Sequence, residues 1–120
     1  MKYLFEPRGI AVIGASQTPG KIGYKVTANI LAGSYKGNLY PINPRGGELL
    51  GIPMYKSLAE VDGPVDVATI IVPADKAFGA VEECATKGVK FVIIITSGFS
   101  EIGNAAEERK ITTYAREHGM

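Results

Sequence analysis

Apolar runs of strand length alternate in this chain with stretches of helical periodicity. The runs lie at residues 9–14, 38–42, 65–72 and 89–95, and helical spacing is found at residues 21–32, 75–87 and 105–118. The third run is almost continuously apolar, as is typical of a parallel strand that is covered on both faces. This alternation predicts an α/β fold. We expect a doubly wound parallel sheet of these four strands in the order 3-2-1-4, with a fifth strand missing.

The length of 120 residues indicates one domain. A doubly wound fold would continue into another strand after the last helix, so we expect residues 1–120 to be a piece of a longer polypeptide. The edge left by the missing strand would expose unpaired backbone groups, and self-association through that edge is therefore expected.

Charge and composition exclude several classes of function. A net charge of +1 gives no bulk attraction to nucleic acid or to an anionic membrane. No apolar run approaches the roughly 20 residues that a membrane helix needs. Cys84 is the single cysteine and cannot form an internal disulfide, which fits a reducing compartment. We expect a cytoplasmic domain without a metal site, because no cluster of residues has metal-ligand spacing.

A loop rich in small residues joins the first apolar run to the first helix. Amide groups at a helix start, together with the helix dipole, attract anions, and glycine lets a phosphate approach the backbone. The loop lacks the Gly-x-Gly-x-x-Gly fingerprint, so a purely structural turn stays open. We predict that the loop binds a phosphate of a nucleotide-like ligand, through Gly14, Ala15, Ser16, Gly20, Lys21, Ile22 and Gly23.

The end of the second apolar run distinguishes between classes of ligand. It reads Asn43, Pro44, Arg45, and it lacks the acidic residue that usually accepts the ribose hydroxyls of a nicotinamide dinucleotide. Arg45 instead suits a phosphate on the ribose, as in NADP or coenzyme A, because guanidinium binds phosphate oxygens by charge-assisted hydrogen bonds. The alternative is that Arg45 is a solvated loop charge.

The two remaining strand ends offer small and polar groups. Pro73 and Ala74 follow the third run, and Thr96 and Ser97 follow the fourth. Such a lining suits a long, thin ligand that carries amide groups, although ordinary turns would look the same. No catalytic constellation is present, since the single histidine, His118, closes the last expected helix.

Ordered sequence blocks give the chain a family resemblance over nearly its whole length. The blocks are IAVIGAS at 10–16, PGKIGY at 19–24, YPINPR at 40–45, LGI at 50–52, YKSL at 55–58, VDVA at 65–68, IVPA at 71–74 and TSGFSEIG at 96–103. In these the chain resembles the N-terminal CoA-binding domain of NDP-forming acyl-CoA synthetases, such as ADP-forming acetyl-CoA synthetase. That domain is related to the succinyl-CoA synthetase alpha subunit.

The resemblance implies a Rossmann-like fold that binds coenzyme A. By motif position, Ser16 and the turn at 20–23 would meet the phosphate end of CoA, and Arg45 would be a basic contact. The pantetheine arm would be flanked by Val72, Pro73, Ala74, Ile95, Thr96 and Ser97.

The resemblance also implies that catalysis lies elsewhere. In such enzymes acyl-CoA, phosphate and ADP are converted to acid, CoA and ATP through a phosphohistidine in a region that follows this domain. His118 does not match that histidine, so the 120 residues should bind CoA or acyl-CoA without catalysing, with the remaining domains or subunits of a synthetase as partners. Two alternatives stay open: an NADP-binding domain of an oxidoreductase, and a non-enzymatic CoA-sensing module.

Overall fold

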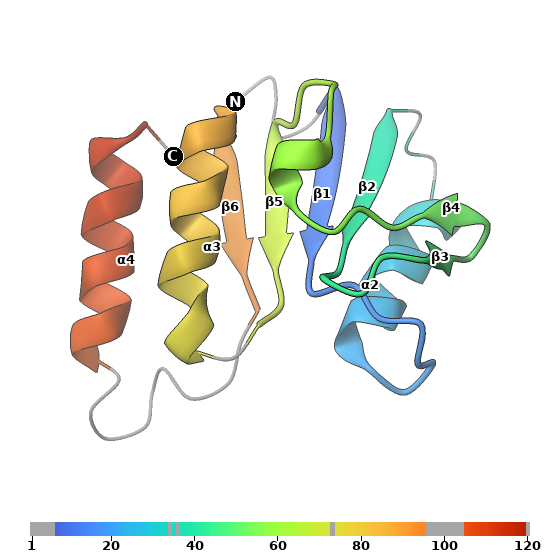
Figure 1. Cartoon of the computed structure of the whole chain (residues 1–120). Helices are drawn as coiled ribbons and strands as arrows, with labels where there is room; N and C mark the ends of the chain where they lie inside the picture. The colour runs from blue at the N-terminus through green and yellow to red at the C-terminus, as the bar shows by residue number, and fades with distance from the viewer. Residues whose placement is uncertain (1–6, 34, 36, 73, 96–104, 120) are drawn as a thin grey trace.

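The computed structural model has the α/β architecture that the alternation of apolar runs predicts (Figure 1). It describes residues 7–33, 35, 37–72, 74–95 and 105–119. The elements in chain order are β1 (Gly9–Ile13), α2 (Ile22–Ala32), β2 (Asn38–Ile42), β3 (Glu48–Leu49), β4 (Ile52–Pro53), the 3₁₀ turn η1 (Leu58–Glu60), β5 (Val67–Ile70), α3 (Ala74–Lys87), β6 (Phe91–Ile94) and α4 (Ala105–Glu117).

The main sheet has four parallel strands in the order β2-β1-β5-β6. The expected order 3-2-1-4 is wrong, because the third apolar run forms β5 and pairs with β1 rather than with the outer side of β2. That outer side is occupied by Tyr55, which makes an isolated parallel bridge to Ile42. With Tyr55 counted as a reduced third strand, the sheet fills positions 3-2-1-4-5 of the Rossmann order. The strand expected after the last helix stays a prediction.

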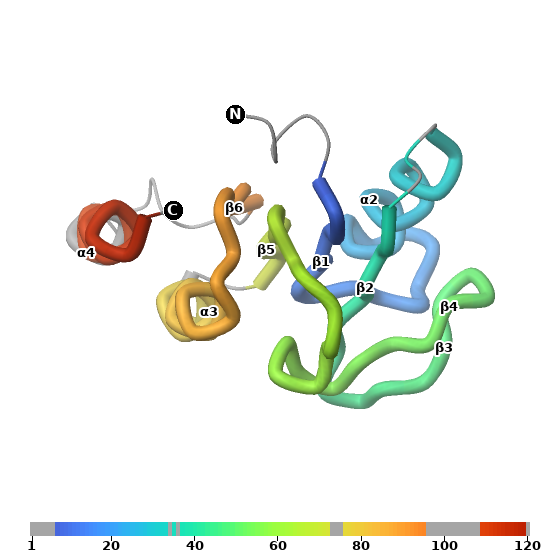
Figure 2. Tube along the Cα trace, turned by 90° about the horizontal axis from the view of Figure 1, so that it is seen from above, coloured from blue at the N-terminus to red at the C-terminus, as the bar shows by residue number. Residues whose placement is uncertain are grey.

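The two faces of the sheet are covered by different elements. Seen from above, α2 lies over one face, α3 lies over the other, and α4 lies beyond β6 (Figure 2). Alternate residues of β1 therefore point to different cores. Ala11 and Ile13 belong to a core with Val81 of α3, whereas Val12 packs in a smaller core with Leu49 and Met54 of the β3–β4 hairpin.

The most deeply buried residues of α2 are small ones. Helical spacing predicts Ile22, Val26, Ile30 and Leu31 on the inner face; Val26 and Ile30 do pack, partly buried, against the smaller core, but Ile22 is 52% and Leu31 is 43% exposed. The fully buried positions are Gly23 and Thr27, one turn apart. The helix approaches the sheet so closely that only a residue without a bulky side chain fits there, and the large apolar residues flank the contact.

The remaining expectations for the helices are partly confirmed. On α3, Ala77, Val81 and Cys84 are buried as predicted. On α4, helical spacing predicts an inner face made of Ile111, Tyr114, Ala115 and His118; Ile111 is buried, Tyr114 and Ala115 are partly buried, and His118 is exposed. Ser57 and Glu60 have the spacing of a capping box at the start of η1, but Ser57 makes no side-chain cap hydrogen bond.

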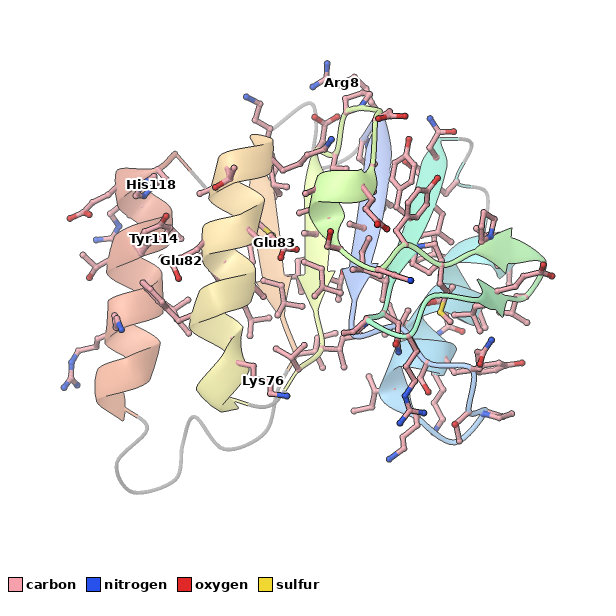
Figure 3. All side chains as sticks on the ribbon, in the orientation of Figure 1. Arg8, Lys76, Glu82, Glu83, Tyr114 and His118 are labelled. Atoms are coloured by element: carbon pink, nitrogen blue, oxygen red, sulfur yellow. The ribbon has the colours of Figure 1, made fainter. Side chains whose placement is uncertain are left out.

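An ion pair fastens the strands at the end opposite their carboxyl ends (Figure 3). The Asp66 carboxylate accepts hydrogen bonds from the Arg8 backbone N–H at 2.8 Å, from Nε at 2.9 Å and from Nη2 at 2.7 Å. Asp66 is fully buried, whereas the Arg8 side chain is half exposed. The hydrogen bonds from the Arg8 side chain hold the pKa of Asp66 below its ordinary value of 3.8, although burial acts in the other direction.

Candidate functional site

The candidate site lies at the carboxyl edge of the sheet, where the chain leaves β1 and β5 in opposite directions. In Figure 1 this is the lower edge, where the loop after β1 and the starts of α2 and α3 are found. Ligands of open parallel sheets bind in the crevice outside the carboxyl ends of the strands. The predicted phosphate loop and the predicted Arg45 loop both leave this edge.

Two glycines let the backbone segments of the edge approach one another closely. Gly14 has φ +98°, and a Cβ added there would lie 1.9 Å from the carbonyl oxygen of Ile71, at the end of β5. A Cβ at Gly23 would lie 2.2 Å from the carbonyl oxygen of Gly14. These contacts draw the first turn of α2 against the end of β1, so both glycines are required by the packing itself.

The first turn of α2 has amide groups that no side chain caps. Lys21 is the N-cap residue, it makes no side-chain cap hydrogen bond, and the turn contains no acidic residue. An uncapped helix start carries unsatisfied N–H donors and partial positive charge. Ser16 lies just before it and accepts a hydrogen bond from the Thr18 N–H at 3.1 Å. The hydroxyl hydrogen of Ser16 stays available for a donated bond.

Asn43 connects this loop to the loop that carries Arg45. Its Nδ2 donates to the Ala15 carbonyl oxygen at 2.7 Å, and its Oδ1 accepts from the Arg45 N–H at 2.8 Å. The amides of Gly14 and Ala15 both donate to the carbonyl oxygen of Ile42, each at 3.1 Å. The two predicted phosphate-binding loops are thus hydrogen-bonded into one unit.

Basic side chains surround this unit. Lys21, Lys25, Arg45 and Lys56 are all exposed. Among the described residues none of the four is in an ion pair, because the ion pair found there joins Arg8 and Asp66. The exposed Arg45 stays a predicted anion contact. Sequence reasoning did not identify Lys56, whose side-chain carbons lie next to Gly46.

Sequence reasoning also missed the contribution of Gln17 and the β3–β4 hairpin. The Gln17 Nε2 donates to the Glu48 carbonyl oxygen, which ties the tip of the phosphate loop to β3. Leu49 and Met54 of the hairpin are buried under the loop with Val12 and Ala15. The glycines at 46, 47 and 51 were the sequence signal for tight turns in this segment, and each of them has a positive φ in the structure.

The other predicted site residues are placed only in part. Val72 is half buried against the larger core, and Ala74 begins α3. Ile95 is 37% exposed, and its N–H donates to the Ile70 carbonyl oxygen at 2.9 Å. Pro73, Thr96 and Ser97 lie outside the described residues, so the predicted lining of a thin channel is untested there.

The titratable residues away from this edge suggest no chemistry. His118 stacks on Tyr114 with ring centroids 4.0 Å apart, on α4 at the end opposite the strand ends (Figure 3). Burial raises the pKa of the Cys84 thiol to about 12, so it is not a nucleophile at neutral pH. In the part of the chain that the structure describes, no group of His, Cys, Asp or Glu could hold a metal ion, and no helix is long and apolar enough to cross a membrane.

Two cavities, of about 530 and 260 Å³, lie along α4. The larger is lined by Phe78 and Tyr114, and the smaller by Val92 and Ile111. None of the predicted site residues lines either cavity, so neither bears on the site at the strand ends.

The sequence matches a known protein family over most of its length. Residues 8–120 match the family described as CoA binding domain. The chain belongs to the CoA-binding domain family. It shares 43% identity over 120 residues with an ADP-forming acetate–CoA ligase of Methanocaldococcus jannaschii, covering 100% of this chain and 17% of that protein. It shares 44% identity over 126 residues with the alpha subunit of ADP-forming acetate–CoA ligase I of Pyrococcus furiosus, covering 100% of this chain and 27% of that subunit.

Solved structures agree with the sequence relatives. The acetyl-coenzyme A synthetase 1 of Ca. Korarchaeum cryptofilum superposes with a TM-score of 0.93 at 45% identity, covering 99% of this chain and 26% of that one. The chain therefore spans about a quarter or less of the length of these relatives. The resemblance to ADP-forming acyl-CoA synthetases that the sequence blocks indicate is confirmed.

Proposed function

We propose that this chain binds coenzyme A at the carboxyl edge of the sheet and forms the CoA-binding part of a cytoplasmic ADP-forming acyl-CoA ligase. The observation that carries the proposal is the uncapped start of α2, drawn against β1 by Gly14 and Gly23 and hydrogen-bonded through Asn43 to the Arg45 loop. Its family membership supports CoA as the ligand.

The phosphates of CoA would divide between two subsites. The diphosphate would meet the loop after β1, which supplies backbone N–H groups, the Ser16 hydroxyl and the Lys21 ammonium group. The loop residues are Gly14, Ala15, Ser16, Gly20, Lys21, Ile22 and Gly23. The 3′-phosphate would meet Arg45, whose guanidinium is exposed beside the second strand end. Pro44 fixes the turn that presents Arg45, and Asn43 supports both subsites.

The pantetheine arm would run along the remaining strand ends. Val72, Pro73 and Ala74 follow β5, and Ile95, Thr96 and Ser97 follow β6. Exposed Ile95 and half-buried Val72 supply apolar surface for the arm's methylene and methyl groups. Phosphoryl transfer would then take place in other domains or subunits, since the described residues offer no nucleophile at this edge.

Calorimetric titration with CoA and dephospho-CoA tests the proposal. We expect the 120-residue chain to bind CoA, and to bind dephospho-CoA about tenfold or more weakly, because a charge-assisted pair contributes about 1.5–3 kcal/mol. Arg45→Ala should weaken CoA binding and abolish this difference. An exposed lysine on the α4 side of the molecule, Lys110→Ala, provides the control for net charge.

The outcomes separate the possible ligands. Equal affinity of the wild type for CoA and dephospho-CoA would contradict the role given to Arg45. Tight binding of NADPH that CoA does not compete away would favour the dinucleotide alternative over a CoA site.

A further inference from the structure

The side chain of Asn43 makes two hydrogen bonds inside the protein. Nδ2 donates to the Ala15 carbonyl oxygen at 2.7 Å, and Oδ1 accepts the Arg45 N–H at 2.8 Å. Its backbone is engaged as well, because its N–H donates to the Tyr55 carbonyl oxygen at 2.8 Å and its carbonyl oxygen accepts from the Gly46 N–H at 2.9 Å. Each end of the Asn43 amide group thus already holds one of the two loops.

The residues around Asn43 belong to three separate segments of the chain. Ala15 lies in the loop after β1, Arg45 lies in the turn after β2, and Tyr55 forms the bridge that stands for the third strand. The turn itself has Asn at its first position, Pro at its second and Gly at its fourth, the residues favoured in a type I turn. Asn43 thus joins the two proposed phosphate subsites through its side chain, next to the Ile42 carbonyl oxygen that accepts from the Gly14 and Ala15 amides.

We propose that Asn43 is a positioning residue that fixes the distance and orientation between the α2 phosphate loop and Arg45. The proposal rests on the CoA-binding function above and adds a positioning role to the ligand contact that the sequence predicted for Asn43. A ligand with phosphates at two places binds tightly only when both subsites are held in a productive geometry before binding, since ordering them afterwards costs free energy. Asn43 supplies that order through one amide group.

Two variants separate the two hydrogen bonds of the side chain. Asn43→Ala removes both of them. Asn43→Asp keeps the acceptor for the Arg45 N–H and removes the donor to the Ala15 carbonyl oxygen. The matched control is Asn38→Ala, because Asn38 is exposed at the other end of the same strand β2.

Nitrogen-15 relaxation of the ligand-free chain tests directly whether Asn43 orders the two loops. In the wild type and in Asn38→Ala we expect order parameters near 0.85, about the value of a rigid backbone, at both 15–20 and 45–47. Asn43→Ala should lower them at both segments, whereas Asn43→Asp should lower them at 15–20 only. Unchanged order parameters in Asn43→Ala would overturn the proposal.

Titration with CoA and dephospho-CoA tests the consequence for binding. In Asn43→Ala the ratio of the two dissociation constants should fall from about tenfold or more toward one, although Arg45 is intact. A general loss of stability would reduce the active fraction without changing this ratio. A wild-type ratio in Asn43→Ala would overturn the proposal. Absence of CoA binding by the wild type would refute the proposed function, and the relaxation measurement would still decide the role of Asn43.

Discussion

Gly23 rests directly on the carbonyl oxygen of Gly14, so closely that a Cβ at position 23 would lie 2.2 Å from that oxygen. This contact fixes the start of α2 against the end of β1. Gly23→Ala should therefore force the helix start outward and destabilise the fold by about 1–3 kcal/mol, the usual cost of overpacking. Thermal unfolding measures the loss, and CoA titration should show weaker binding by the displaced first turn.

Gly20→Ala is the matched control for Gly23→Ala. Gly20 lies in the same loop, has no positive φ, and a Cβ added there would meet nothing within 4 Å. We expect Gly20→Ala to leave the melting temperature within about a degree or to raise it slightly, since alanine reduces the entropy of the unfolded chain. Equal destabilisation by both substitutions would show that the loop, and not the contact with Gly14, sets the cost.

The buried Asp66 predicts a loss of stability in acid. Because its pKa is below 3.8 in the folded chain, the unfolded chain binds the proton first. The stability that this group contributes is present above about pH 4, the ordinary aspartate range, and is lost as the pH falls through the folded-state pKa. Asp66→Asn should be less stable than the wild type at pH 7, and its melting temperature should fall less between pH 5 and pH 2.5.

Asp62→Asn provides the comparison for Asp66→Asn. Asp62 is exposed in the loop after η1. Its neutralisation should therefore have little effect on the melting temperature at pH 7 or on the acid dependence of the melting temperature. If Asp66→Asn showed the same acid dependence as the wild type, the Arg8–Asp66 pair would not contribute to folding stability.

The sequence predicted the four strands of the main sheet but not which strands are neighbours. A long apolar run such as 65–72 predicts a buried strand by its composition alone. The carboxyl ends of parallel strands lie at one edge of the sheet whatever the order of the strands. The order depends on Tyr55, and a strand reduced to one bridge leaves no apolar run to detect. The most buried positions of α2 were missed for a related reason, since hydrophobic periodicity counts large residues, whereas Gly23 and Thr27 pack because they are small.

The roles within the site needed coordinates for a different reason. Asn43, Arg45 and the glycines could be named from their positions after strands, because residue type indicates chemistry. The hydrogen bond from the Asn43 amide to the Ala15 carbonyl oxygen forms only because the fold brings together two residues that are 28 positions apart in the sequence. A single sequence carries no signal for that pairing.

Leu50 at the tip of the β3–β4 hairpin gives a prediction of increased stability. Leu50 and Gly51 form the two-residue turn, with φ +52° and +84°, and Leu50 is the non-glycine residue with positive φ in the described part of the chain. A turn of this kind favours Asn-Gly, and left-handed backbone costs an ordinary residue about 1–2 kcal/mol. Leu50→Asn should raise the free energy of unfolding by about 1 kcal/mol.

Leu31→Asn is the control for Leu50→Asn. Leu31 is exposed to a similar degree, 43% against 45%, but it lies near the end of α2. Asparagine is a poorer helix former than leucine, so this substitution should be neutral or slightly destabilising. A loss of stability in Leu50→Asn would mean that packing of the Leu50 side chain stabilises the fold by more than its left-handed backbone conformation destabilises it.

The free edge of β6 predicts self-association of the 120-residue chain. In the described sheet β6 pairs only with β5, and Ile93 on this strand is 45% exposed. An exposed, apolar edge strand offers unpaired backbone groups to a second copy, and a charge on it opposes such pairing. Sedimentation velocity over a range of concentrations should show dimer for the wild type and monomer for Ile93→Lys. Leu31→Lys places the same charge on a helix and should leave the dimer intact, whereas a wild type that stays monomeric throughout the range would contradict pairing through this edge.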